Sequence, residues 1–546
     1  MSDVSTGTEQ QRLAGPLSAA VANLCVRLQP QVSPRTAAGF REVLRRLSAP
    51  LQVAVAGRIK SGKSTLVNAL IGRRVAPTDI GECTRLVTRF SYGTVDRVEV
   101  VFTDGRRQVL PFDTNGMIPA DLDAVTDSEA HVSHLEAYLT NDVLRDLTVI
   151  DTPGLGSLHA ASVSRTELLL GTADAPPRAG GNGDGTGDGT GDGTVDADDL
   201  DPVSTNAVAG AEAVIYVVTQ SVRADDHQAL AAFTAATARR EAGPVNAIAV
   251  LNKVDTIAPE SVTEAEGSVW RAAELLAAKQ AALLKPRVAD VLPVIGLLAE
   301  SAETGGFTSA DAEALRALAE LDETTWETML ISADLFTSWE VPVPAGTRVR
   351  LLEKLDLYGL RGAIAALRED PQLTAGALRR LLLERSGLAG VRSRLDEVFR
   401  ARADGIKAAA ALASITALAH ASGDPGERQR VHDAIEVLLT KPEAHQLRLL
   451  EALTLVASGA VDMPEDLAEE VLRVGSTADV GDQLGLPGRP AADHVAYALE
   501  RAGWWRSFAS FGATPAQSRV AHVVHRAYFL LWQQLREQTG GGGRRR

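Results

Sequence analysis

Residues 57–64 read Gly-Arg-Ile-Lys-Ser-Gly-Lys-Ser, which is a complete phosphate-binding loop. The apolar run Leu51–Ala56 precedes the loop and predicts a buried strand, and Thr65–Ile71 predicts the start of a helix. The two glycines let the backbone wrap so that successive N–H groups point at a phosphate chain, and the helix N-terminus adds partial positive charge. This stretch therefore predicts an α/β fold with a nucleoside triphosphate site at a strand end.

The side chains of this loop divide into phosphate and metal ligands. We expect Lys63 to reach the β- and γ-phosphates, and the hydroxyl of Ser64 to hold Mg²⁺. The nucleotide-binding residues expected from the loop and the first turn of its helix are Gly57, Lys60, Ser61, Gly62, Lys63, Ser64 and Thr65.

Two later segments supply candidates for metal and γ-phosphate contacts. Leu147–Ile150 is an apolar run that ends in Asp151-Thr152-Pro153-Gly154. An aspartate at that strand end can hold Mg²⁺, usually through water, and Gly154 lets its N–H approach the γ-phosphate. In the polar stretch after the phosphate-binding loop, Thr84 is the expected switch threonine, with its hydroxyl on Mg²⁺ and its N–H on the γ-phosphate. Its alternatives are Thr78 and Thr88.

A third strand end predicts the base. Ala247–Leu251 is another buried-strand run, and Asn252-Lys253-Val254-Asp255 follows it. The carboxylate of Asp255 can accept from both N1–H and the exocyclic amine of guanine, whereas adenine offers neither in that geometry. The Lys253 stem can cover the base. After the strand candidate at residues 291–295, Gly296 stands where a base-contacting loop is expected. This order of motifs resembles that of the GTPases and favours GTP over ATP.

Composition narrows the class of protein. The 546 residues are too many for one ordinary domain, and the formal net charge of −15 argues against broad nucleic-acid binding. The two cysteines, Cys25 and Cys83, lie far apart in the sequence and indicate a reducing cytoplasm. Because no run approaches about 18 apolar residues, we expect any membrane contact to be peripheral.

The chain divides into a multi-domain arrangement. Apolar residues at three- and four-residue spacing predict two helices before residue 50, and a hairpin is expected around Asp104-Gly105. Strands alternate with helices up to about residue 300 and predict a parallel sheet, and the sequence after Thr374 reads as helices throughout. The segment around 172–202 repeats Gly-Asp-Gly-Thr and is expected to be a disordered insertion rather than a calcium site, because no liganding glutamate follows. The expected units are N-terminal helices joining a neck (1–49), a GTPase domain (50–370), a helical neck and stalk (371–537) and a tail (538–546).

These motifs and this order of units resemble the dynamin superfamily. The stretch GRIKSGKSTLVNALIGRRVAPTDIGECTRLVTRF, with DTPGLGS and VIYVVTQ later, is most similar to the actinobacterial dynamin-like proteins, including the isoniazid-inducible ones. The resemblance implies a GTPase that binds GTP and GDP with Mg²⁺, self-assembles, lies at the inner face of the cell membrane and remodels it. It further implies a role in envelope maintenance or septation, and a second dynamin-like paralogue as a partner.

The phosphate-binding loop departs from the pattern of eukaryotic dynamins. Those proteins carry a catalytic glutamine at the position of Ile59 and, at the position of Lys60, a serine that helps to hold a monovalent cation. Guanylate-binding proteins place an arginine at the Lys60 position. The resemblance therefore implies that Lys60 supplies its own charge to the transition state; the alternative is a lysine that faces solvent or only aids binding. The expected catalytic residues are Lys60, Lys63, Thr84 and Gly154, and the expected metal ligands are Ser64, Thr84 and Asp151.

Two other functions fit the same motifs. One is a soluble switch GTPase whose helical part binds a protein effector, and the other is a scaffold that binds GTP with little turnover. For membrane contact, the aromatic stretch from Gly503 to Phe511 and the apolar segment Leu453–Val461 are the candidates. A helix corner that buries two tryptophans is the competing interpretation of the aromatic stretch.

Overall fold

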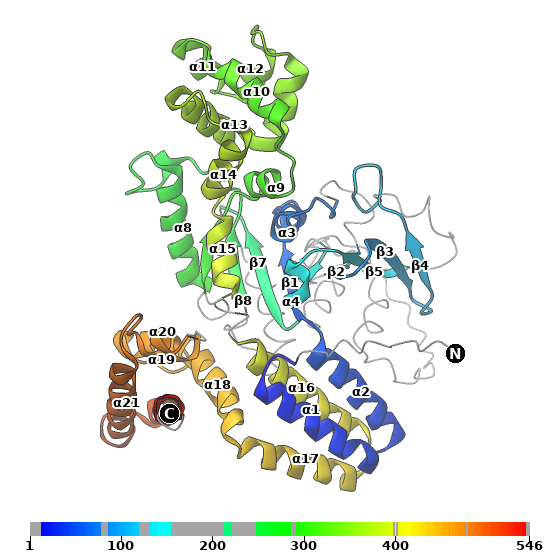
Figure 1. Ribbon diagram of the computed structural model, residues 1–546, viewed down its shortest axis with the longest axis vertical. Coiled ribbons are helices and arrows are strands. Elements are labelled where there is room, and N and C mark those ends of the chain that lie inside the picture. Colours follow the sequence, from blue (N-terminus) through cyan, green and yellow to red (C-terminus); the bar gives the residue numbers. More distant parts are fainter. Residues whose placement is uncertain are drawn as a thin grey trace, which may run out of the picture.

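The structure, a computed structural model, describes residues 13–77, 86–119, 132–153, 211–220, 247–284, 288, 290–396, 399, 402–457, 459–476 and 479–541. Its centre is a β-sheet with helices on both faces, and helical bundles extend from one end of this sheet core (Figure 1). The predicted α/β core followed by a helical region is confirmed.

The sheet has nine strands among the described residues, in the order β4-β3-β5-β2-β6-β1-β7-β8-β9. β1 lies near the middle and pairs in parallel with β6 and β7, so the strand that carries the phosphate-binding loop is flanked on both sides. The strands are β1 (Leu51–Gly57), β2 (Thr88–Tyr92), β3 (Arg97–Phe102), β4 (Arg107–Leu110), β5 (Val132–Leu139), β6 (Leu147–Asp151), β7 (Ala213–Val218), β8 (Ala247–Leu251) and β9 (Val291–Pro293).

The sheet is mixed, so the prediction of a parallel sheet is correct for its half from β6 to β9 and for the pair of β2 with β5. β2 runs antiparallel to β6, and β3 runs antiparallel to both β4 and β5. The predicted hairpin at Asp104-Gly105 is confirmed as the β3–β4 connection, where Gly105 adopts a φ of 84°. The sequence patterns do not predict that β2 pairs antiparallel to β6 or β3 to β5, because these pairings depend on contacts between residues far apart in the chain.

Helices cover both faces of the central strands, which are buried along their whole length as expected for strands in the middle of an α/β sheet. On one face, Val53 of β1 shares a hydrophobic cluster with Leu66 of α3 (Lys63–Ile71). On the other face, Ala54 shares a cluster with Ala272 of α8 (Val269–Leu284). The period-two alternation of β1 therefore sends successive side chains to different helices.

Several helices follow β9, and the sequence patterns do not predict their individual bounds. They share a hydrophobic cluster with α8, and α10 to α13 extend away from the sheet (Figure 1). The helix α13 is interrupted at Asp356, and its second half begins at Leu357. The helices of this region are α9 (Gly296–Glu303), α10 (Ser309–Ala319), α11 (Glu323–Met329), α12 (Ala333–Ser338), α13 (Ala345–Glu369), α14 (Ala375–Ser386) and α15 (Leu388–Leu395), and the short α4 (Val143–Asp146) precedes β6.

A neck bundle joins helices that precede the sheet core to helices that follow it. The N-terminal helices pack against helices that follow residue 400, and buried residues such as Leu17, Leu24 and Ile415 form one cluster (Figure 1). The bundle consists of α1 (Pro16–Leu28), α2 (Pro34–Ser48), α16 (Ala403–Ala421) and α17 (Pro425–Leu439).

Carboxylates from the later helices cap the N-terminal ones. Asp404 accepts from the backbone N–H groups of Leu17 (3.0 Å) and Ser18 (2.7 Å) at the start of α1. Glu427 accepts from the N–H of Ser33, the N-cap of α2, at 2.7 Å. A negative charge at a helix N-terminus satisfies free N–H groups and complements the helix dipole, so these contacts stabilise the neck bundle as a unit.

A buried ion pair connects the neck bundle to the sheet core. Nζ of Lys407 on α16 lies 3.4 Å from Oε1 of Glu212, just before β7, and donates to the carbonyl of Arg46 on α2 at 2.9 Å. The other oxygen of Glu212 accepts from the N–H of Gln52 in β1 at 2.9 Å. Burial raises the pKa of Glu212 and lowers that of Lys407, and the charge of each partner opposes the shift of the other.

The C-terminal bundle is organised by Glu470 and buries Trp505 of the aromatic stretch. Glu470 accepts from Nε1 of Trp505 at 3.0 Å and from the hydroxyl of Tyr528 at 2.6 Å, and it pairs with Arg501. The bundle comprises α18 (His445–Ala457), α19 (Glu465–Ser476), α20 (Val480–Leu484), α21 (Ala491–Phe511) and α22 (Pro515–Gly541).

The two candidate membrane segments fare differently. Leu453, Val456 and Val461 are buried in the bundle, so their side chains are not at the surface in this structure. Trp505 is fully buried, whereas Trp504 is 39% and Phe511 94% exposed, so only part of the aromatic stretch faces outward. None of the helices in the described ranges combines the length and apolar character needed to span a bilayer.

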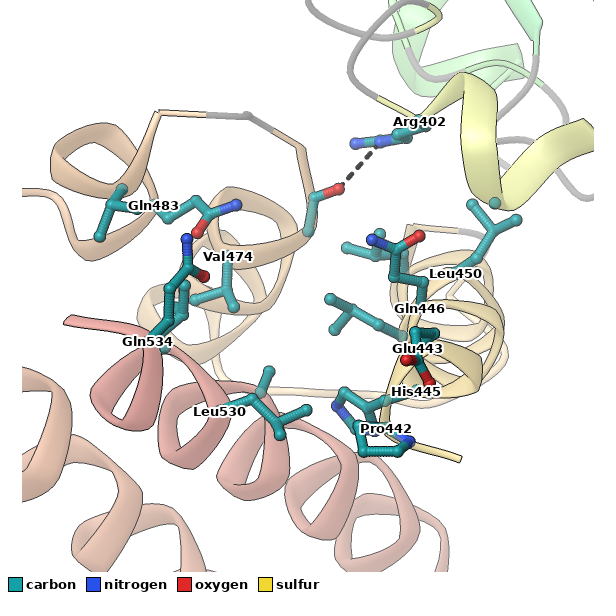
Figure 2. Close-up of a pocket in the computed structure, with 17 residues that line it drawn as sticks. Arg402, Pro442, Glu443, His445, Gln446, Leu450, Val474, Gln483, Leu530 and Gln534 are labelled. Atoms are coloured by element: carbon teal, nitrogen blue, oxygen red, sulfur yellow. Dashed lines mark hydrogen bonds between the residues drawn. The ribbon is translucent and has the colours of Figure 1, made fainter. Parts of the chain in front are cut away.

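A cavity of about 280 Å³ lies where α16 meets the C-terminal bundle (Figure 2). Arg402 stands at its edge and donates from Nε to the carbonyl of Gly475 at 3.1 Å. Leucines from α18 and α22, among them Leu450 and Leu530, supply much of the remaining wall. All of its lining residues follow residue 400, so the cavity belongs to the helical region and not to the nucleotide site.

Substituting Lys407 by Met is expected to lower the free energy of unfolding by about 3–5 kcal/mol, because it leaves Glu212 buried without its partner. Adding Glu212→Gln should recover most of this loss, since glutamine keeps an acceptor for the N–H of Gln52 without a charge. Urea denaturation of both variants measures the difference, with Lys441→Met, at an exposed lysine after α17, as the control. A Lys407→Met variant that is as stable as the wild type would contradict the prediction.

Candidate functional site

The phosphate-binding loop has a backbone that only certain residues adopt easily. Gly57, Lys60 and Gly62 have φ values of 151°, 61° and 90°. Left-handed residues among right-handed ones turn successive N–H groups toward one point and form an anion-binding concavity. A Cβ on Gly57 would stand 2.5 Å from the carbonyl oxygen of Val217, so the close approach of β1 and β7 also requires glycine there.

Lys63 begins α3 and is buried at the base of the loop, with 7% of its surface exposed. Its Nζ donates to the carbonyl of Arg58 at 2.9 Å, so the ammonium lies inside the curve of the loop. Burial lowers the pKa of Lys63, and the nearby carboxylate of Asp151 opposes the shift. A desolvated ammonium in this position suits a polyanionic ligand, which replaces the lost hydration with direct charge contact.

Ser64 and Asp151 meet as expected for two members of one metal site. The hydroxyl of Ser64 donates to Oδ2 of Asp151 at 2.9 Å. Oδ1 of Asp151 is buried and has no hydrogen-bond partner among the described residues, and burial raises the pKa of this carboxyl to about 6. A hard cation such as Mg²⁺ prefers hydroxyl and carboxylate oxygens, so these two residues fit it.

Asn252 joins three segments of the site. Its Nδ2 donates to the carbonyl of Ser61 at 2.9 Å, and its Oδ1 accepts from the N–H of Gly296 at 2.9 Å and of Lys253 at 2.8 Å. A Cβ on Gly62 would lie 2.2 Å from Nδ2, so the second glycine of the loop is required by this contact. The side chain thus holds the loop, the end of β8 and the start of α9 together.

The predicted base-recognition residues follow directly. Lys253 is exposed and has a φ of 61°, and Asp255 lies in the short helical turn Val254–Thr256. Burial is the main cause that raises the pKa of Asp255, and the charge of Asp356 adds to it. A half-buried carboxylate is well placed to accept hydrogen bonds from a base, because it has already lost part of its hydration.

A cavity of about 470 Å³ opens beside the loop. Its lining includes Lys60, Ser61 and Lys253, which the sequence predicts as nucleotide-binding residues, and also the end of β7 and Thr256, which the sequence analysis does not place in the site. Gln220 donates to the carbonyl of Thr256 at 2.5 Å and so connects those two missed segments. The order of strands could have indicated the end of β7, because the strand beside β1 in a parallel sheet also ends at the edge where the ligand binds.

Of the remaining predicted site residues, some lie in the described part of the chain and others do not. Thr65 lies in the first turn of α3, and Thr88 opens β2 opposite Asp151 with 5% of its surface exposed. Thr84, Gly154 and Thr78 lie outside the described residues, as do Cys83 and the insertion at 172–202.

Comparison with known proteins gives the family. The dynamin family profile matches residues 53–254, the span from β1 to just beyond Asn252. The isoniazid-induced protein IniC of Mycobacterium tuberculosis is 31% identical over 472 residues, which cover 84% of this chain and 85% of that protein. The chain belongs to the dynamin family. The sheet core with its phosphate-binding loop is thus a dynamin-family GTPase domain.

More distant relatives match in part. The bacterial dynamin-like protein of Nostoc punctiforme is 30% identical over 131 residues, or 22% of this chain and 18% of that protein. A solved structure of an oligomerised bacterial dynamin pair aligns with 99% of this chain and 79% of its own at 13% identity. Its TM-score of 0.28 is too low to establish a common arrangement of the domains.

Proposed function

We propose that this dynamin-family protein binds GTP with Mg²⁺, hydrolyses it to GDP and phosphate, and couples hydrolysis to self-assembly and to peripheral binding or remodelling of a membrane. The observation that carries the proposal is the Asn252 side chain, which fixes the phosphate-binding loop against the segment that holds Asp255. The phosphate and base ends of the site therefore have one geometry. The protein would act at the inner face of the cell membrane, in envelope maintenance or septation.

Each residue has a distinct part in binding. Lys63 and the backbone N–H groups of the loop hold the phosphates, and Asp255 accepts from guanine. Ser64 and Asp151 would hold Mg²⁺, and Thr84 would join them as the switch threonine. The cation, when bound, neutralises charge on the β- and γ-phosphates. Gly154 would contribute its N–H to the γ-phosphate.

Lys63→Ala is expected to abolish GTP binding while the protein remains folded, because it removes the charge partner of the phosphates. Asp255→Asn should weaken GTP binding by roughly 1–3 kcal/mol, the cost of leaving donors unpaired. Isothermal titration calorimetry with GTP, ATP and xanthosine triphosphate measures both effects. Xanthine carries a carbonyl where guanine has its amine, so the Asp255→Asn variant should gain affinity for it.

The matched control is Lys279→Ala, at an exposed lysine on α8. Equal affinity of the wild type for GTP and ATP would refute guanine recognition, and unchanged GTP affinity in the Lys63→Ala variant would refute the assignment of the site.

We further propose that Lys60 provides transition-state charge. The side chain is exposed on the lining of the 470 Å³ cavity, next to Ile59, which is 46% exposed and has no polar group to orient water or a cation. The left-handed backbone at Lys60 belongs to the anion-binding curve of the loop, so its side chain is attached at the phosphate side of the site.

If Lys60 supplies this charge, turnover should be nearly equal in sodium, potassium and bulky organic-cation buffers. Lys60→Ser should lower turnover about 10²-fold, the scale of one preorganised charge donor, and change GTP affinity far less. Steady-state phosphate release in the three buffers makes the test. A requirement for sodium or potassium in the wild type, or full turnover in Lys60→Ala, would contradict the role.

The membrane part of the proposal rests on membership of the dynamin family and on the helical bundles that extend from the GTPase domain (Figure 1). We propose self-association, with the GTPase domains as one contact, and a second dynamin-like paralogue as a further partner. The competing functions, a switch that acts on a protein effector and a scaffold with little turnover, share the nucleotide site but need no bilayer.

We expect the protein to co-sediment with anionic liposomes and to turn over GTP faster at high protein concentration with liposomes present. The exposed aromatics of α21 offer a local probe, so Phe511→Ser should reduce co-sedimentation, with Trp505 left intact to preserve the core. Failure to bind liposomes at any nucleotide state would favour the effector switch, and GTP binding without turnover would favour the scaffold.

A further inference from the structure

Gln280 on α8 is a buried residue whose amide reaches the end of the strand beside β1. The residue is 4% exposed. Its Nε2 donates to the carbonyls of Thr219 and Gln220, each at 3.2 Å, directly after the last residue of β7. A glutamine amide has two N–H donors, so it can serve both carbonyls at once. Gln280 therefore holds the end of β7 against α8.

The orientation of the Gln280 amide is fixed by these two carbonyls. Its Oε1 is buried and has no hydrogen-bond partner within the described part of the chain. Turning the amide over would bring this oxygen against the two carbonyl oxygens, which also lack donors. A buried acceptor without a partner costs free energy that an apolar side chain would avoid. The contact with β7 is therefore what the glutamine contributes at this position.

Gln220 extends the connection to the turn that follows Asn252. Its Nε2 donates to the carbonyl of Thr256 at 2.5 Å and to the hydroxyl oxygen of Thr256 at 2.8 Å. The Thr256 hydroxyl in turn donates to the carbonyl of Lys253 at 2.7 Å. Lys253 has a φ of 61°, so this hydroxyl contact holds a left-handed residue that would otherwise relax. Hydrogen bonds thus run from α8 through the end of β7 to the turn that contains Asp255.

The two walls of the 470 Å³ cavity are held by different contacts. Gln220, Lys253 and Thr256 line one side, and Ser61 of the phosphate-binding loop lines the other. Ser61 is held by the amide of Asn252, which makes none of the contacts of Gln220 or Gln280 described above. A change at either glutamine should therefore displace the base side of the site and leave the phosphate side in place.

We propose that Gln280 and Gln220 are positioning residues for guanine binding. Gln280 fixes the end of β7, and Gln220 fixes the turn that presents Lys253 and Asp255 to the base. This inference rests on the proposed GTP binding and deepens it, because both glutamines lie outside the phosphate-binding loop and the Asn-Lys-x-Asp motif.

The test measures GTP binding by isothermal titration calorimetry in Gln220→Met, Gln280→Met and the double variant. Methionine keeps the length of the side chain and removes its donors, and Gln220 is exposed, so at least that variant should fold like the wild type. Each single variant should bind GTP about fivefold more weakly, the factor of one net neutral hydrogen bond, with unchanged stoichiometry. The double variant should also lose about fivefold and not about 25-fold, because residues in one chain of contacts are not additive.

Turnover separates positioning from a general loss of structure. At saturating GTP, kcat should equal that of the wild type in all three variants, since the phosphate side keeps its contacts. Gln429→Met is the matched control, because Gln429 is an exposed glutamine of α17 with a side-chain hydrogen bond of its own to Asp433. This control should bind GTP like the wild type.

A reduced stoichiometry or a reduced kcat in place of a reduced affinity would show a merely structural role and overturn the inference. A loss of about 25-fold in the double variant would overturn the link between the two glutamines. GTP affinity that falls in Asp255→Asn but in neither glutamine variant would overturn this inference and leave the proposed function standing. A wild type that binds no GTP would overturn both.

Discussion

The buried amide of Asn252 is the contact on which the nucleotide site depends. It is 2% exposed and satisfies one acceptor and two donors of the backbone, each from a different segment of the site. Losing this side chain would leave those groups unpaired in the interior, where each costs about 1–3 kcal/mol. The 2.2 Å approach to Gly62 shows the reverse dependence, since the loop must lack a side chain for the amide to reach it. Phosphate binding and base recognition are therefore properties of one hydrogen-bonded unit.

Two strained backbone positions belong to this unit. The described residues include five non-glycine residues with positive φ, and two of them, Lys60 and Lys253, line the nucleotide site. Such conformations persist only where the surroundings leave no alternative. Here the surroundings are β1, β7 and β8, whose residues are almost all buried and packed on both faces. The rigid sheet offsets the cost of a loop that is shaped for its ligand before the ligand arrives.

Charge at the junction of the GTPase domain and the neck bundle gives the fold its second constraint. Glu212 binds the N–H of Gln52 at the start of β1, and Lys407 binds both that carboxylate and the end of α2. A buried pair of this kind adds little net stability over apolar residues but penalises any arrangement that separates the partners. Asp404 and Glu427 act in the same way on the N-termini of α1 and α2. Lys407 of α16 is thus bonded to Glu212, which lies just before β7 and binds the start of β1, and both of these strands lead to the nucleotide site.

The sequence alone determined the local features of this protein. The phosphate-binding loop and α3 follow from adjacent residues, the β3–β4 hairpin from Asp104-Gly105, and α1 from a stripe of leucines and valines. The meeting of Ser64 with Asp151 was also predictable, because parallel strands end at the same edge of a sheet. The tertiary structure decided the antiparallel pairing of β2 with β6 and the burial of Trp505 on Glu470. These features depend on contacts between residues from 35 to about 60 positions apart, and such contacts leave no periodic or motif signal in the chain because their partners are chosen only when the core packs.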